Sequence, residues 1–188
     1  MAAMAQTDQV TAIERLLAIE EIKQLKARYF RCMDQKKWDE FQAVFAPDVV
    51  FDLREAIFAR NPMTGEIMKS GDLLVRQEQM RDEDWLHHGA AAVRNWEETI
   101  LTGVVTMHQG HMPEITITSP TTAHGYWHME HLLRFPRINP YAQYWWIPDN
   151  APFHQLHGFG LYDETYQRLA EGWRIKTLKL THFRVDIT

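Results

Sequence analysis

From Gly103 onward the hydrophobic period of this chain is that of strands, and this limits the folds that the chain can adopt. Before Gly103 the longest regular pattern, from Ile13 to Met33, has the spacing of a helix. After Gly103 the apolar residues alternate with polar residues, which predicts strands over 104–118, 122–135, 156–169 and 173–186. Helices first and a run of long strands last is typical of an α+β domain. We therefore expect a curved antiparallel sheet, wrapped by the N-terminal helices into a cone with an internal pocket.

The N-terminal half predicts one long helix and several shorter elements. The long amphipathic helix is expected to begin after an N-cap at Thr7 or Asp8. Its apolar stripe should contain Ile13, Leu16, Leu17, Ile22, Leu25, Tyr29 and Met33. The other expected elements are a short helix, a strand, a helical piece in an irregular region and a last helix, at 39–45, 49–53, 73–85 and 89–101.

Charge and composition exclude several classes of protein. The chain has 20 Lys and Arg against 25 Asp and Glu, so it carries no electrostatic footprint for nucleic acid or an anionic membrane. No apolar stretch approaches the roughly 20 residues of a membrane-spanning helix. Cys32 is the only cysteine, and the first residues lack the features of a signal peptide, so we expect a cytoplasmic protein. With 45% hydrophobic residues and no repeat or linker, residues 1–188 are expected to form one domain.

Aromatic residues are abundant, with 7 Trp, 6 Tyr and 9 Phe beside 10 His. Trp and Tyr combine apolar area with a polar group, which suits a pocket for a small hydrophobic, aromatic and partly oxygenated substrate. Core packing is the competing explanation for each ring taken singly. An aromatic excursion at 136–152 interrupts the strands, and loops of this length often form lids or subunit contacts. We expect it to serve as one of these in a homodimer or homotrimer.

Two residues lie in contexts typical of a general acid/base pair. Asp34 is expected at the end of the first helix, in the segment MDQKKWD at 33–39, and His108 in the middle of a strand, in the segment TMHQG at 106–110. A carboxylate that orients an imidazole makes a base tuned near neutral pH, and such a pair can relay a proton without a metal or an organic cofactor. Alone, each residue has a structural explanation, as a surface carboxylate and a core imidazole. Together they favour catalysis.

The order of elements and the segments MDQKKWD at 33–39, FAPDVVFD at 45–52 and GWRI at 172–175 resemble the SnoaL-like branch of the nuclear transport factor 2 superfamily. The resemblance covers nearly the whole chain and implies the cone-shaped fold. The local motifs are similar to those of scytalone dehydratase, whose catalytic Asp lies in an Asp-x-Lys-x-Trp-Asp stretch and whose catalytic His follows a Thr-x-His strand start. These motifs correspond to Asp34 and His108. A dehydrochlorinase that acts on lindane carries a similarly placed pair.

The chain departs from scytalone dehydratase in its pocket. The Tyr that precedes the catalytic Asp in that enzyme is Met33 here, and a second pocket Tyr corresponds to Leu53. Its Ser and Asn pocket positions fall on Gly160 and Tyr162, while its second catalytic His falls near His131. The resemblance therefore implies a related reaction on a different molecule.

Strand alternation predicts the neighbours of His108 in the pocket. If His108 points inward, Met112 shares its face, and Trp127 with His131 share the inner face of the next strand. Tyr162 and Tyr29 could donate hydrogen bonds to a developing oxyanion, although Tyr162 could equally be a core ring. The residues predicted to bind substrate are Tyr29, Leu53, Met112, Trp127, His131 and Tyr162.

Three classes of function remain open. The first is a cofactor-independent lyase that eliminates water or halide, or releases an aldehyde such as formaldehyde by a retro-aldol step. The second is an isomerase or cyclase, like ketosteroid isomerase and the polyketide cyclases of the superfamily. The third is a ligand carrier or the small subunit of an aromatic-ring dioxygenase. No metal is expected, because regular alternation puts His108 and His111 on opposite faces, and no nicotinamide or flavin is expected either.

Overall fold

A computed structural model of the protein describes residues 10–56, 58–60, 67–69, 82–135 and 155–187. The helices are α1 (Ala12–Asp34), α2 (Trp38–Gln42) and α3 (Ala90–Leu101), with a 3-10 turn, η3, at Asp82–Trp85. The strands are β1 (Phe45–Glu55), β2 (Phe58–Arg60), β3 (Ile67–Lys69), β4 (Leu86–His88), β5 (Val105–Ser119), β6 (Thr122–Arg134), β7 (Gln155–Leu169) and β8 (Gly172–Ile187). The fold is α+β, with β1, β5 to β8 and α3 close to their predicted ranges, whereas the short strands β2, β3 and β4 were not predicted.

Six of the strands form one sheet in the order β4-β1-β8-β7-β6-β5, and β2 and β3 form a separate pair. Strands β5 to β8 are antiparallel neighbours, as predicted, whereas β1 pairs parallel with β8. The sheet is therefore mixed: the predicted antiparallel arrangement is confirmed for β5 to β8, and the parallel pairing of β1 with β8 was not part of the prediction. The hydrophobic pattern predicts that β1 exists, but its partner is a strand more than 100 residues later in the chain, which no local pattern specifies.

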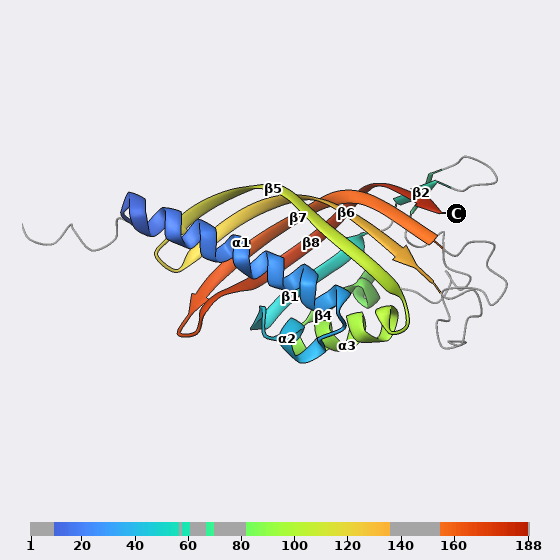
Figure 1. Cartoon of the computed structure of the whole chain (residues 1–188), viewed down its shortest axis with the longest axis horizontal. Helices are drawn as coiled ribbons and strands as arrows, with labels where there is room; N and C mark the ends of the chain where they lie inside the picture. The colour runs from blue at the N-terminus through green and yellow to red at the C-terminus, as the bar shows by residue number, and fades with distance from the viewer. Residues whose placement is uncertain (1–9, 57, 61–66, 70–81, 136–154, 188) are drawn as a thin grey trace, which may run out of the picture.

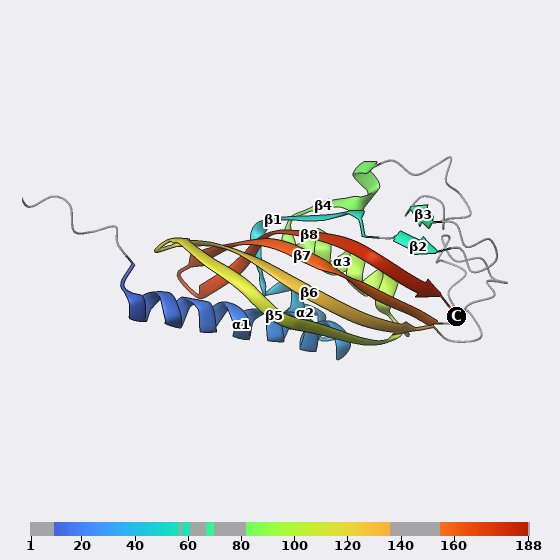
Figure 2. The same cartoon turned by 90° about the horizontal axis from the view of Figure 1, so that it is seen from above.

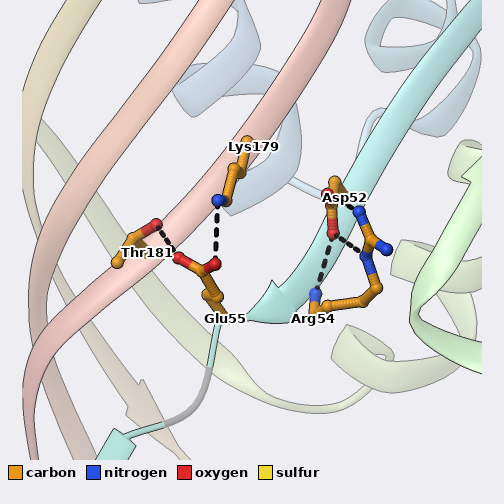
Figure 3. A network of polar contacts seen from close by, with 5 residues as sticks. All are labelled: Asp52, Arg54, Glu55, Lys179 and Thr181. Carbon is orange, nitrogen blue, oxygen red and sulfur yellow. Dashed lines mark hydrogen bonds and ion pairs between the residues drawn. The ribbon is translucent and has the colours of Figure 1, made fainter. Parts of the chain in front are cut away.

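Polar contacts connect the end of β1 to β8 (Figure 3). Glu55 accepts hydrogen bonds from Lys179 Nζ at 2.9 Å and from Thr181 Oγ1 at 3.1 Å. Beside them, Arg54 turns back to Asp52 on the same strand, with 2.7 Å between guanidinium and carboxylate. Exposed ion pairs of this kind contribute only about 0–1 kcal/mol. They therefore help to fix the register of the parallel pairing more than they stabilise the domain.

Helix α1 runs diagonally across one face of the curved sheet (Figure 1), and the view turned by 90° shows it as a separate layer (Figure 2). It begins with a capping box, in which the Thr11 hydroxyl accepts from Glu14 N at 3.2 Å and the Glu14 carboxylate accepts from Thr11 N at 2.8 Å. The cap predicted at Thr7 or Asp8 is therefore wrong.

The apolar stripe of α1 is buried only in its C-terminal part. Ile22, Leu25, Tyr29 and Met33 are buried as predicted. Ile13, Leu16 and Leu17 are 59% to 72% exposed, because the first turns of α1 extend past the ends of the hairpins (Figure 1).

Close packing of α1 on β5 depends on Gly110. A Cβ atom at this position would lie 2.6 Å from Cε2 of Phe30, well inside van der Waals contact. Glycine therefore lets the helix approach the strand that carries His108, and this approach places the end of α1 beside the middle of β5.

Two predicted segments lie largely or wholly outside the described residues. Of the helical piece expected at 73–85, only η3 is described, as a 3-10 turn. The aromatic excursion at 136–152, on which the expected oligomer depended, is not among them. Within the described part of the chain, no helix is long and apolar enough to cross a membrane.

Candidate active site

Asp34 is the last residue of α1, where the chain leaves the helix through a Schellman turn. Lys37 N donates to Cys32 O at 2.8 Å, and Lys36 N donates to Met33 O at 3.2 Å. A carboxylate at this end of a helix faces the negative end of the macrodipole, which is unfavourable. The local structure therefore has to supply donors that compensate for the position of Asp34.

Those donors come from β5. The Thr106 hydroxyl donates to Asp34 Oδ1 at 2.9 Å, and the backbone N–H of His108 donates to Oδ2, also at 2.9 Å. Burial by itself would raise the pKa of Asp34, but hydrogen bonds from His108 and Thr106 outweigh it and hold that pKa below its usual value. Asp34 is therefore a carboxylate at neutral pH.

The predicted contact between Asp34 and His108 is present. His108 Nδ1 lies 2.6 Å from Asp34 Oδ1, and the imidazole side chain is 5% exposed. The carboxylate accepts a hydrogen bond from the Nδ1–H group, so the neutral ring carries its lone pair on Nε2. Burial lowers the pKa of His108, and the bond to Asp34 only partly opposes this. Phe30 stacks against the ring, with 6.5 Å between centroids and 10° between planes. The result is a neutral imidazole fixed in one orientation.

Lys36 completes this network from an unusual backbone conformation. Its φ is 58°, in the left-handed region that glycine normally occupies at this position of a Schellman turn. Its Nζ donates to Thr106 Oγ1 at 2.8 Å, and burial lowers its pKa to about 8. Backbone strain of this kind concentrates at functional sites. Here it places an ammonium group beside the hydroxyl that supports Asp34.

His108 lies on the wall of an apolar cavity of about 120 Å³. An engineered cavity of roughly 150 Å³ is large enough to hold benzene, so this space is comparable to one aromatic ring. The other lining residues come from α1, β1 and the residue after it, η3, α3, β6 and the residue after it, β7 and β8. They are Tyr29, Met33, Phe51, Leu53, Ala56, Trp85, Trp96, Glu97, Ile100, Leu101, His131, Leu133, Phe135, Leu156, Tyr162, Leu180, His182 and Val185.

Two tyrosines provide hydroxyl groups to this cavity. The side chains of Tyr29 and Tyr162 hydrogen-bond one another, and burial raises both pKa values far above neutral pH. Behind their rings lies the fully buried ion pair of Lys26 with Glu164. Glu164 also accepts a hydrogen bond from the Tyr166 hydroxyl. The tyrosines therefore stay protonated and can act as hydrogen-bond donors.

A pair of histidines forms another part of the wall. His131 lies directly across the β5–β6 ladder from His108, with 5.4 Å between ring centroids. Its Nε2 is 3.2 Å from Nε2 of His182 on β8. Burial lowers the pKa of His131 well below its usual value and that of His182 to about 3, so both rings are neutral. One of the two must donate to the other across this contact.

The structure places four of the six predicted substrate-binding residues on the cavity wall with His108. These are Tyr29, Leu53, His131 and Tyr162. Asp34 lies behind His108, as its orienting role requires. The register of β6 that carries His131 is now defined by its pairing with His108.

Two predicted positions are corrected. Met112 is 89% exposed, because an irregularity in β5 between Gly110 and Pro113 shifts the alternation of its side chains. Trp127 points inward but packs in the core, where its indole N–H donates to the Tyr166 hydroxyl at 2.8 Å. Neither residue is among those that line the cavity.

Sequence reasoning missed Glu97 and His182. Glu97 occupies the apolar stripe of α3, four residues after Val93 and four before Leu101. His182 continues the inward alternation of Leu178 and Leu180 on β8. A single polar residue at an apolar position of an otherwise regular pattern was the available signal in both cases. Among the described residues, no three His, Cys, Asp or Glu side chains form a group that could hold a metal ion.

Comparison with known proteins agrees with this architecture. The family model of the SnoaL-like domain matches residues 14–179 of the sequence. A protein of Kribbella flavida is similar in structure, with a TM-score of 0.65 and 18% identity over 91% of this chain and 94% of that one. So is a protein of Novosphingobium aromaticivorans described as a candidate scytalone dehydratase, with a TM-score of 0.65 and 16% identity over 95% and 92%. A hexachlorocyclohexane dehydrochlorinase of Novosphingobium barchaimii gives 0.64 and 10% over 95% and 94%. At these identities the likeness establishes the fold.

Proposed function

The chain belongs to the SnoaL-like domain family, and we propose that it acts within this family as a cofactor-independent lyase. The observation that carries the proposal is the 2.6 Å contact of Asp34 with a neutral, buried His108 on the wall of an apolar cavity. A base of this kind needs no metal or organic cofactor to remove a proton. The presence of a dehydrochlorinase and a candidate scytalone dehydratase among similar structures supports elimination as the reaction class.

In the proposed elimination, Nε2 of His108 takes a proton from a carbon atom adjacent to a carbonyl group. The electron pair of that C–H bond forms the new double bond, and the leaving group departs with the electrons of its own bond, as a halide ion or as hydroxide that takes up a proton to become water. In the retro-aldol variant, Nε2 instead takes a hydroxyl proton and a C–C bond breaks to release an aldehyde. The C–C electron pair forms an enolate, which then takes the proton back from Nε2. Asp34 stabilises the imidazolium ion in either case, and a positioned base of this type contributes about a hundredfold to ten-thousandfold in rate.

The hydroxyl pair of Tyr29 and Tyr162 is suited to stabilise the enolate oxygen that develops in either reaction. Both groups stay protonated at neutral pH, and since one donates to the other, the pair keeps one O–H group free for the oxyanion. A positioned hydrogen-bond donor of this kind is worth several kcal/mol. The same donor beside a neutral base would also serve an isomerase, which moves a proton without a leaving group. Isomerisation is therefore the second candidate.

The substrate class follows from the shape and chemistry of the cavity. Its wall is mainly apolar, and its volume of about 120 Å³ suits a molecule with one aromatic ring. The histidines and tyrosines on the wall are neutral, so an uncharged carbonyl or phenolic compound is expected to bind better than an anion.

The test uses 4-hydroxy-4-phenylbutan-2-one as a probe. Dehydration gives the conjugated enone, retro-aldol cleavage gives benzaldehyde and acetone, and a β,γ-unsaturated ketone offered separately tests isomerisation. His108→Ala and Asp34→Asn should lose about a hundredfold to ten-thousandfold in rate. His128→Ala changes an exposed histidine on the outer face of β6 and should behave like the wild type. Activity should survive exhaustive chelation. Loss of activity with a chelator, or normal turnover by His108→Ala, would contradict the proposal.

A further inference from the structure

Glu97 has a carboxyl group on the cavity wall that takes no part in the reaction proposed above. It lies on α3 in a stripe that is otherwise apolar, with Ala90, Val93 and Leu101 as the other buried positions. Its side chain is 6% exposed and lines the same cavity as His108. Within the described part of the chain, no hydrogen bond or ion pair joins its carboxyl oxygens to another side chain. Among these residues, then, Glu97 has no structural partner, and a buried carboxyl without one is costly to retain, which points to a role in chemistry.

Among the described residues, the titratable groups that interact with Glu97 or share its cavity come from five other parts of the fold. They are Tyr29 and Lys36 from α1 and the turn after it, His108 from β5, His131 from β6, Tyr162 from β7 and His182 from β8. Lys36 is the only cation among them, and its ammonium group is already hydrogen-bonded to Thr106. Burial raises the pKa of Glu97 to about 7, and the charge of Lys36 opposes this only in part. Glu97 can therefore hold a proton at neutral pH.

We propose that Glu97 is the general acid of this site, which protonates the departing oxygen while His108 removes the proton from carbon. This inference rests on the lyase function proposed above and names the second proton-transfer group of the same site. It also explains why the acid comes from a helix and the base from the sheet. A substrate held between α3 and β5 can be approached by an acid and a base from separate elements.

The elimination is balanced when both groups act. His108 Nε2 gains the proton from carbon, and the C–H electron pair becomes the second bond of the alkene. The C–O electron pair leaves with the hydroxyl oxygen, which takes the proton of Glu97 and departs as water. His108 is then an imidazolium ion and Glu97 a carboxylate, and transfer of one proton from the first to the second through water restores both.

The neighbouring histidine, His131, is less suited to this role. Its Nε2 contacts His182, and burial together with the adjacent imidazoles keeps it neutral. A neutral imidazole is a very weak acid, whereas a protonated carboxyl group donates its proton readily to a departing hydroxyl group. His131 can still hydrogen-bond the substrate and position it.

The test compares leaving groups that differ in their need for a proton. The probes are 4-phenylbutan-2-ones that carry hydroxyl, methoxy or chlorine at carbon 4, with appearance of the enone as the readout. Glu97→Gln should lose about a hundredfold or more with hydroxyl and methoxy, the usual contribution of general acid catalysis. It should lose little with chlorine, which departs as a stable chloride ion and needs no proton. Glu97→Asp should recover part of the loss. Glu98→Gln, which changes the next residue of α3, a partly exposed carboxylate in an ion pair with Arg94, is the matched control.

The pH profile gives a second readout. Wild-type rates with the hydroxyl probe should fall as the pH rises through about 7, where Glu97 loses its proton, and Glu97→Gln should lack this alkaline limb. Equal losses with all three leaving groups, in a Glu97→Gln protein that unfolds like the wild type, would overturn the acid role. If His108→Ala then still abolished turnover, the lyase function would survive. A wild type inactive on every probe would instead remove the lyase function and the acid role together.

Discussion

The Nζ atom of Lys26 lies 3.6 Å from the centroid of the Tyr162 ring and 3.9 Å from that of Tyr29. The ammonium group, whose pKa burial lowers to about 8 although Glu164 opposes this, therefore faces two rings whose hydroxyl groups hydrogen-bond one another beside the cavity. Cation–π contacts of a desolvated ammonium group are worth about 2 kcal/mol. The charge also makes the phenol hydroxyls better hydrogen-bond donors, which links a buried ion pair in the core to the chemistry of the pocket.

Replacement of this lysine should destabilise the protein. Lys26→Met leaves the Glu164 carboxylate buried without its counter-ion, which should cost about 3–5 kcal/mol. The double variant Lys26→Met with Glu164→Gln removes both charges and should recover most of the loss. Urea unfolding of the wild type, the single variant and the double variant measures the difference. If Lys26→Met were as stable as the wild type, Glu164 would not be left as an uncompensated buried charge when Lys26 is removed, and the prediction would be wrong.

The influence of Asp34 on His108 can be measured without a substrate. Burial lowers the pKa of His108, and the bond to Asp34 raises it again in part. Asp34→Asn should therefore lower the pKa of His108 further, because the imidazolium form loses its counter-ion. The proton NMR signals of the imidazole ring, followed against pH, report this pKa directly. Asp39→Asn changes an exposed carboxylate five residues later and should leave the pKa unchanged.

Much of the fold could be predicted from the sequence because its strands are long and regular. Alternation predicted the four strands β5 to β8 within a few residues, since each strand buries one face. The parallel partner of β1 and the start of α1 were not predicted correctly. Pairing between β1 and β8 depends on contacts across the whole chain, whereas the capping box of Thr11 and Glu14 was a local signal that was overlooked.

The candidate site also contains residues that could be predicted from the sequence and residues that could not. Asp34 and His108 could be predicted because family motifs surround them. Met112 was placed wrongly because an irregularity in β5 reverses the alternation, and a single-residue shift moves a side chain to the other face. Glu97 and His182 were missed because no motif includes them, and their role depends on a cavity formed by elements far apart in the sequence.

Gly158 controls the space around the histidine pair. A Cβ atom at this position would lie 2.2 Å from Nε2 of His131 and 2.9 Å from Nε2 of His182. Gly158→Ala should therefore displace both imidazoles, with a loss of about 1–3 kcal/mol from overpacking. Gly125→Ala is the control, because its nearest new neighbour is a Tyr166 ring carbon at 3.2 Å. Urea unfolding and the NMR signals of the two histidines measure the effect. Unchanged histidine signals in Gly158→Ala would contradict the predicted displacement.

Glu97 should make stability depend on pH in a direction that few carboxyl groups show. Its folded-state pKa of about 7 lies above the value of 4.5 for an exposed glutamate, so the folded state binds more protons between these values. The contribution to stability is complete below about pH 4.5 and is lost as the pH rises through about 7, where folding must bury a charge. One pKa unit is worth about 1.4 kcal/mol, so Glu97→Gln should gain up to about 3 kcal/mol relative to the wild type between pH 5 and pH 8. Urea unfolding at a series of pH values measures this difference, with Glu98→Gln as the control. A constant difference between Glu97→Gln and the wild type across that range would show that Glu97 is ionised throughout, and the carboxyl group could not then supply a proton in the site.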